Sequence, residues 1–205
     1  LLIAKYLQTY KLCNIKRRRP VTLNSVIPAS PKLKHHQFKR HQLIPLTNVL
    51  LWRIDTGVVR TLTKNEEENI ITLGFWGQGD IVGQPLFPFH PYQVECLTIV
   101  QASILPKGYF YTQEVMLSHI QKNQEILKIL HSRKIKLRLL RLLNWLADRF
   151  GNQLPEGKVL DIRLTHQEIA DTICTSRVTV TRLLSELEKE NKIGCSQGNY
   201  LILFN

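Results

Sequence analysis

Acidic residues are absent from the first 54 positions of this 205-residue chain, although those positions hold eleven Lys or Arg residues. The other 151 positions hold 17 basic and 16 acidic residues, so the formal net charge of +12 lies mostly at the N-terminal end. A basic segment such as Lys16–Arg19 attracts phosphates nonspecifically and less strongly as salt rises. Two other interpretations of residues 1–30 remain open: a solvated, disordered tail, and an organelle transit peptide, which is also poor in acidic residues.

The chain also lacks cysteine pairs and long apolar runs. Its four cysteines are scattered without a CxxC pair, which argues against a zinc ribbon and favours free thiols in a reducing compartment. The chain contains no run of about 18 apolar residues, so no transmembrane helix is predicted. Leu1–Tyr10 is too short and too polar for a secretory signal. We therefore expect no membrane association. The histidine spacing is not diagnostic of a metal or haem site, so we expect none at His35, His36, His41 or His90.

Residues 164–187, LTHQEIADTICTSRVTVTRLLSEL, predict two short helices joined by a tight turn. Thr165 is a candidate N-cap, and Glu168 completes a capping box. Ile169 and Ile173 lie four apart and so share an inward face. Ser176 is a candidate cap for the second helix, whose apolar stripe consists of Val180, Leu183, Leu184 and Leu187.

The second helix opens with small polar and basic side chains, as in helix-turn-helix proteins that insert this end into the major groove. An arginine can donate two hydrogen bonds to guanine, and an apolar side chain can contact a thymine methyl group. The other interpretation is an ordinary helical hairpin with a solvated polar face. The predicted DNA-binding residues are Ser176, Arg177, Val178, Thr179, Arg182, His166 and Gln167. Arg177 and Arg182 would anchor bases and phosphates, Val178 and Thr179 would discriminate, and the others would position the DNA backbone.

The segment after these helices predicts a β-hairpin, from Ile193 to Ser196 and from Tyr200 to Phe204 around a Gln197-Gly198 turn. A helix-turn-helix followed by a hairpin is a winged arrangement, and its wing can contact phosphates. GNQLPEGK, residues 151–158, is expected to be a loop that leads into this domain.

The string THQEIADTICTSRVTVTRLLSELEKENKI resembles the DNA-binding domain of the cyclic AMP receptor protein and FNR (CRP/FNR) superfamily of transcriptional regulators. SRVTVTRLL is similar to the cyanobacterial and plastid branch that includes the global nitrogen regulator. The resemblance implies a homodimer on a palindromic double-stranded DNA site. Val178 replaces a glutamate that accepts from cytosine in the cyclic AMP branch, which implies GTA-type rather than GTGA-type half-sites. Cys174 stands where the family usually has a turn glycine.

Residues 38–106 alternate short β-branched runs with turn residues, which predicts an antiparallel roll or barrel. The expected strands lie in VLLWRI, VVRTLT, NIITLGFW, DIVGQPL, YQVECLTIV and ASILP. LLWRIDTGVVRTLT and GFWGQGDIVGQ resemble the double-stranded β-helix effector domain of the same superfamily. The fold class is therefore expected to be α+β, with a basic segment (1–30), a β-roll (31–111), linking and dimerisation helices (112–149) and a winged helix-turn-helix (150–205).

The resemblance does not extend to the family's cyclic-nucleotide residues. Gln84 stands where the family has glutamate, and the following segment PFHPYQVECL contains no arginine to pair with a cyclic phosphate. A phosphate would instead meet Glu95. The nearby cations Arg53, Arg60 and Lys107 have no spacing that indicates an anion site. We therefore expect cyclic AMP binding to be absent or very weak and leave the effector unknown. The clustered N-terminal cysteines with which the FNR branch holds an iron–sulfur cluster are also missing, so no cofactor is identified.

Tyr111–Phe150 contains no glycine or proline and predicts helix. LRLLRLLNWLADRFG resembles the helix that leads into the family's winged domain. In the family, a long upstream helix pairs with its twofold mate; here Asn123–Leu139 is several turns shorter than that pattern. The alternative is that these leucines pack only within one subunit. In related activators a surface near Gly151–Lys158 touches RNA polymerase, so polymerase is a further expected partner.

Two other functions remain open beside a DNA-binding regulator. A nucleic-acid-processing enzyme would need clustered carboxylates or an activated nucleophile. Glu66–Glu68 lies at an expected hairpin tip, and no Ser/His/Asp or Cys/His arrangement is readable, so we expect no catalytic residue. The other open function is that of a small-molecule sensor that acts through protein partners. The expected location is a bacterial cytoplasm, such as that of a cyanobacterium, or a plastid stroma.

Overall fold

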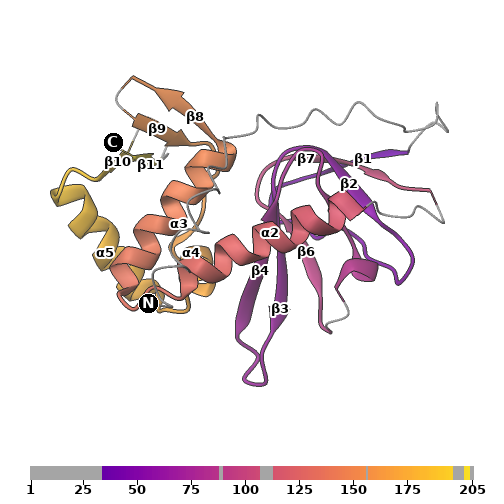
Figure 1. The fold of residues 1–205 in the computed structure, drawn as a ribbon, viewed down its shortest axis with the longest axis horizontal. Helices are drawn as coiled ribbons and strands as arrows, with labels where there is room; N and C mark the ends of the chain where they lie inside the picture. The colour runs from indigo at the N-terminus through magenta and orange to yellow at the C-terminus, as the bar shows by residue number, and fades with distance from the viewer. Residues whose placement is uncertain (1–33, 88–89, 107–112, 156, 196–200, 204–205) are drawn as a thin grey trace, which may run out of the picture. The chain divides into compact units, whose positions relative to one another are not determined.

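The fold is taken from a computed structural model that describes residues 34–87, 90–106, 113–155, 157–195 and 201–203. The N-terminal part consists of two antiparallel sheets (Figure 1). One has the order β1-β7-β2-β5, formed by His35–Phe38, Val100–Ile104, Trp52–Thr56 and Ile81–Val82. The other has the order β4-β3-β6, formed by Ile70–Trp76, Val59–Lys64 and Gln93–Cys96. The basic segment 1–30 lies outside the described residues.

Both sheets contribute to one buried core, which includes Trp52 and Ile54 of β2, Val59 of β3 and Trp76 of β4. The tight turn between β2 and β3 depends on Gly57, whose φ is +87°. A side chain there would place its Cβ 2.3 Å from the carbonyl oxygen of Ile99. The expected roll is thus present, and glycine is required where its hairpin meets a neighbouring strand.

Two details of the predicted strands are wrong. DIVGQPL supplies only the two-residue strand β5, because the 3₁₀ helix η2 (Gln84–Leu86) follows it. Pro85 has no N–H to donate to a strand ladder and has a φ suited to a helical turn. Strand β1, which pairs with β7 in the register His35↔Ser103, is absent from the predicted strands. The signal of β1 is weak because three of its four residues are exposed.

Two helices follow the roll: α2 (Gln113–Leu130) and α3 (Ile135–Phe150). Within the described residues, α2 therefore ends at Leu130 and α3 begins at Ile135, so the stretch 123–139 is not one continuous helix. The helical backbone is interrupted at residues 131–134. There Arg138 donates from Nε to the carbonyl of Ser132 at 2.7 Å. This side-chain donor satisfies a carbonyl that has no helical partner at the break. Among the described residues, no helix is long and apolar enough to cross a membrane.

The C-terminal part contains α4 (His166–Ile173) and α5 (Arg177–Lys189) beside a third sheet of order β10-β11-β9-β8. Its strands are Ile193–Cys195, Leu201–Leu203, Gly157–Leu160 and Gly151–Leu154. The predicted wing pairs as expected, Ile193 with Leu203, although its turn at 197–198 lies outside the described residues.

Residues 151–158 are not the expected loop, because β8 and β9 pair as a hairpin with Gly151 opposite Leu160. A Cβ on Gly151 would lie 2.4 Å from the carbonyl oxygen of Val159, so glycine permits this close approach. The hairpin adds two strands to the wing and ties it to the C-terminal end of α3.

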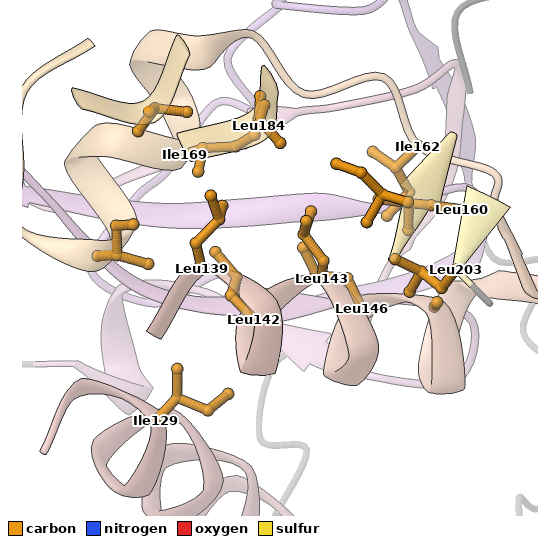
Figure 2. Close-up of a cluster of buried hydrophobic side chains, with 14 of the residues drawn as sticks. Ile129, Leu139, Leu142, Leu143, Leu146, Leu160, Ile162, Ile169, Leu184 and Leu203 are labelled. Carbon is orange, nitrogen blue, oxygen red and sulfur yellow. The ribbon is translucent and has the colours of Figure 1, made fainter. Parts of the chain in front are cut away.

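An apolar cluster holds the helices and this sheet together (Figure 2). The side chains that α3 contributes recur at helical spacing and are fully buried: Leu139, Leu142, Leu143 and Leu146. Ile169 and Leu184 reach the cluster from α4 and α5, and Leu160 and Leu203 reach it from the sheet. Each of the inward-facing apolar residues predicted for the two short helices is buried.

Candidate nucleic-acid interface

Both short helices begin with the caps that the sequence predicts. Thr165 Oγ1 accepts from the Glu168 amide at 3.1 Å, and Glu168 Oε2 accepts from the Thr165 amide at 2.6 Å. These reciprocal bonds form the capping box of α4. Ser176 caps α5 by accepting from the Thr179 amide at 3.2 Å. The start of each helix, and thus the direction in which α5 presents its first residues, is fixed by local hydrogen bonds.

The turn between the helices is left-handed at Cys174, with φ 55° and ψ 59°. This is the backbone conformation for which the family's usual glycine is suited. The thiol is exposed. The Cys174 and Thr175 amides donate to the carbonyl of Ala170 and so close α4. The chain thus keeps the turn geometry without the glycine.

The N-terminal half of α5 has a solvent-facing side, which we call the reading face and which consists of Arg177, Val178, Thr181, Arg182 and Ser185. The opposite side is buried against the core. Val178 is 78% exposed, although it is a large apolar residue. No packing role accounts for that exposure, so the side chain is available to an external partner.

The two arginines of the reading face are not held by strong interactions within the chain. The guanidinium of Arg182 pairs with Glu186 one turn further along α5. Arg177 is the first residue of α5, and within the described part of the chain its guanidinium has no hydrogen bond or ion pair. Exposed pairs of the Arg182–Glu186 kind contribute little stability, so either arginine can turn to another anion at low cost.

Residues of α4 border the reading face. His166 Nδ1 and Thr181 Oγ1 share a hydrogen bond of 2.8 Å across the two helices. Gln167 donates from Nε2 to Asp171 Oδ1 at 2.7 Å within α4. The structure therefore brings the seven predicted DNA-binding residues to the N-terminal ends of α4 and α5.

Two points about this surface escaped the residue selection made from sequence. Thr179 is half-buried and so less accessible than its neighbours Arg177 and Val178. Its hydroxyl lies 2.9 Å from that of Ser176, so it belongs partly to the cap. Thr181 was not selected, although it is exposed and central to the reading face. Its spacing of four residues from Arg177 places both on one side of the helix, so the sequence locates Thr181 on the polar face although it was not among the seven selected residues.

The positions that would bind a cyclic nucleotide are engaged otherwise. Gln84 donates from Nε2 to the carbonyl of Phe87 at 2.9 Å. Glu95 accepts from Arg60 Nε at 2.8 Å. Arg53 pairs with Asp55 at 3.0 Å, and Lys107 lies outside the described residues. Neither described arginine that sequence offered as a partner for an anionic effector is therefore free.

Aromatic side chains occupy the interior of the roll. His119 of α2 stacks on Trp76 with ring centroids 4.1 Å apart, and its ring lies 5.9 Å from that of Phe87. Phe87 in turn stacks on Tyr92 at 5.0 Å. Burial lowers the pKa of His119, and the nearby Asp80 carboxylate opposes that shift. Stacked aromatic rings thus fill this part of the roll.

Comparison with known proteins extends these observations. Residues 137–204 match the Crp-like helix-turn-helix domain. The regulatory protein CysR of Synechococcus elongatus is 35% identical over 169 residues, which is 81% of this chain and 82% of that protein. The global nitrogen regulator of the same organism is 36% identical over 88 residues, which is 43% of this chain and 39% of that protein.

Solved structures share the whole arrangement. A CRP-family transcriptional regulator from Thermus thermophilus superposes with a TM-score of 0.69 at 23% identity, over 83% of this chain and 92% of that one. FixK2 from Bradyrhizobium japonicum gives a TM-score of 0.70 at 15% identity, over 84% and 93%. The fold is thus that of the CRP/FNR proteins, and the match to CysR covers 81% of this chain. This chain belongs to the CRP/FNR family of transcriptional regulators, close to its cyanobacterial branch.

Proposed function

We propose that this chain is a homodimeric transcription factor that binds a palindromic double-stranded DNA site through α5. The observation that carries the proposal is the open N-terminal end of α5, where Arg177 and Val178 are exposed beside a helix start capped by Ser176. In a helix-turn-helix, these first residues of the second helix reach base edges. The winged sheet beside it supplies backbone for phosphate contacts.

The roles of the seven predicted residues follow from their chemistry. Arg177 takes a guanine, because its guanidinium offers two donors in one plane. Val178 contacts a thymine methyl group and cannot accept from cytosine, which supports a GTA-type half-site. Arg182 exchanges Glu186 for a phosphate. Thr179, Ser176, His166 and Gln167 line the edges of the contact and fix its register on the DNA backbone.

The effector is a separate part of the proposal. Cyclic AMP is not expected to bind, because Glu95 and Gln84 stand where a cyclic phosphate would need a cation and a glutamate. The pairing of Arg53 and Arg60 with carboxylates supports the same conclusion for other small anions. We propose no nucleotide or other small-anion ligand for the roll and leave the natural effector open.

The remaining parts of the proposal concern the cell. The relatives are regulators, so we expect this chain to act without catalysis, in the cytoplasm. The β8–β9 hairpin lies in the region that touches RNA polymerase in related activators, and its exposed residues Asn152 and Gln153 are available for such a contact. Plastid stroma is the alternative location.

The test is selection of bound sequences from random DNA, followed by titration of the selected site with wild-type and Arg177→Ala protein. Loss of the two-donor contact should cost about 1–3 kcal/mol, equivalent to roughly 5–150-fold in Kd, and should relax preference at one base of each half-site. The thermal midpoint should not change, because Arg177 is exposed and unpaired in the described structure.

Lys189→Ala is the matched control, since Lys189 is an exposed cation at the far end of the same helix. It should keep the base preference of the wild type. If the Arg177→Ala protein selected the same site with wild-type affinity, the assignment of α5 as the reading helix would be wrong. Selection of no sequence at all by wild-type protein would favour a sensor that acts through protein partners.

A further inference from the structure

Four charged or polar side chains converge where the roll meets α4. His41 follows β1, Arg60 lies on β3, Glu95 lies on β6 and Glu168 lies in the first turn of α4. Arg60 Nε donates to Glu95 Oε2 at 2.8 Å, and His41 Nδ1 lies 2.9 Å from Glu95 Oε1. The side chains of Arg60 and Glu168 are each 6% exposed and that of Glu95 is 13% exposed, so three of the four groups are shielded from water and His41 forms the open side.

One carboxylate oxygen of Glu168 lacks a hydrogen bond in this cluster. Its Oε2 is committed to the capping box of α4. Its Oε1 is buried and has no hydrogen-bond partner among the described residues. The nearest cationic atoms are Arg60 Nη2 at 3.6 Å and His41 Nδ1 at 3.8 Å. A buried carboxylate oxygen without a hydrogen bond is costly, and such exceptions call for an explanation.

A divalent cation would satisfy this oxygen. One ligand atom from each of His41, Glu95 and Glu168 lies within 4.8 Å of the other two. Tetrahedral Zn²⁺ at about 2.0–2.2 Å from nitrogen and oxygen ligands holds them roughly 3.3 Å apart, which small side-chain movements here would reach. We propose that His41, Glu95 and Glu168 form a Zn²⁺ site. His41 is 47% exposed, which leaves an entry path and a coordination position for water.

Arg60 acts on this site in two ways. It holds Glu95 through Oε2 and leaves Oε1 for the metal, as outer hydrogen bonds commonly do for ligating carboxylates. It also brings one positive charge against the two carboxylates. With a neutral imidazole the four groups sum to −1, and a bound Zn²⁺ brings the sum to +1. The site is therefore weaker than one without the arginine and suits reversible rather than permanent binding.

The ligands come from both domains, since His41 and Glu95 belong to the roll and Glu168 belongs to α4. Zn²⁺ bound there would cross-link the roll to the first helix of the helix-turn-helix. Histidine spacing could not reveal such a site, because the carboxylates lie 54 and 127 residues away from His41 in sequence. The assignment does not depend on the proposed DNA reading, since metal binding is measured on the protein alone.

The experiment is calorimetric titration of tag-free, metal-free full chain with Zn²⁺ alone, together with thermal unfolding at each metal concentration. We expect one saturable site per chain that disappears in His41→Asn, or weakens by at least about 10–100-fold. The thermal midpoint should rise with Zn²⁺ in the wild type and not in the variant. Asparagine suits this test because His41 has φ 63°, a conformation that asparagine tolerates.

His35→Asn is the matched control. His35 is likewise an exposed histidine with a carboxylate partner, Asp55 at 3.2 Å, but it lies outside the cluster. Its variant should bind Zn²⁺ as the wild type does, and Glu95→Gln should behave like His41→Asn. Absence of saturable binding, or equal binding in wild type and His41→Asn, would mean an ion-pair network only and would overturn the proposal.

Discussion

Cys174 carries a left-handed backbone that costs a residue with a side chain about 1–2 kcal/mol. Cys174→Gly should remove that cost, while glycine's greater freedom in the unfolded chain returns about 0.5–1 kcal/mol of it. We therefore expect the free energy of unfolding to rise by up to about 1 kcal/mol. The urea midpoint measures it. Cys174→Ala is the control, because it removes the exposed thiol and keeps the Cβ. Equal midpoints for the two variants would show that the strain does not exceed the entropy that glycine adds to the unfolded chain.

Val178 determines base preference in the proposed complex. Val178→Glu places a carboxylate where valine offers only methyl groups, and a carboxylate accepts from cytosine N4. The selected half-site should move from GTA-type toward GTGA-type, by about 1–3 kcal/mol of discrimination at the new base pair. Sequencing of DNA selected by each protein measures the change.

Val178→Ala is the control, because it removes the valine methyl groups without adding a hydrogen-bond acceptor. It should weaken preference for the thymine and should not create a preference for cytosine. Since residue 178 is 78% exposed, neither substitution should alter folding. Selection of an unchanged sequence by the glutamate variant would place this side chain away from the bases.

Elements with strong local signals could be predicted, and those without them could not. The caps at Thr165 and Ser176 form with immediate neighbours, so sequence spacing located α4 and α5. Strands β8 and β9 lack that information, because GNQLPEGK reads as turn residues and becomes a hairpin only by pairing with β11. The interruption between α2 and α3 could likewise not be predicted, because residues 131–134 contain no glycine or proline.

Helix α2 presents an apolar stripe of Met116, Ile120 and Leu127, which are 41%, 49% and 53% exposed. Their spacing of four and seven residues matches a helix seam, and the helix length of 18 residues gives about 27 Å for pairing. We expect this stripe to meet its copy in a twofold dimer, since an isologous contact joins the same surface of each subunit.

Ile120→Glu tests that contact by placing a charge in the seam. The mass in solution, from light scattering, should fall from a dimer to a monomer, and affinity for the palindromic site should fall with it. Gln121→Glu is the control, because residue 121 is also exposed on α2 but lies off the stripe. A dimeric Ile120→Glu protein would indicate that these residues do not form the interface.

Contacts between distant segments join the roll to α4, and these lie beyond prediction from one sequence. The hydroxyls of Thr172 of α4 and Thr72 of β4 share a hydrogen bond of 3.2 Å, although the two residues lie 100 positions apart in sequence. Both side chains are buried, and Arg60 reaches Glu168 over a similar separation. Nothing in the local spacing of any of these residues announces its partner. The same limit explains why sequence placed Glu95 only against a hypothetical phosphate, whereas the structure pairs it with Arg60 and His41.

The distribution of charge along the chain separates two kinds of DNA attraction. Residues 158–205 hold six basic and six acidic side chains, whereas residues 1–30 hold six basic and no acidic ones. Specific reading should therefore depend on placed contacts in α5, and nonspecific attraction should depend on the basic segment. Deleting residues 1–30 should lower affinity for random DNA and leave the selected sequence unchanged.

Salt dependence measures the difference. Removing one phosphate interaction flattens the plot of log K against log salt concentration by about 0.9, so the truncated protein should show a clearly shallower slope. A full-length protein with glutamine at positions 16–19 is the matched control, since it keeps the chain length and removes four charges. It should show a partial flattening. An unchanged slope in both proteins would mean that the basic segment does not meet DNA, and a changed site preference would mean that it takes part in reading.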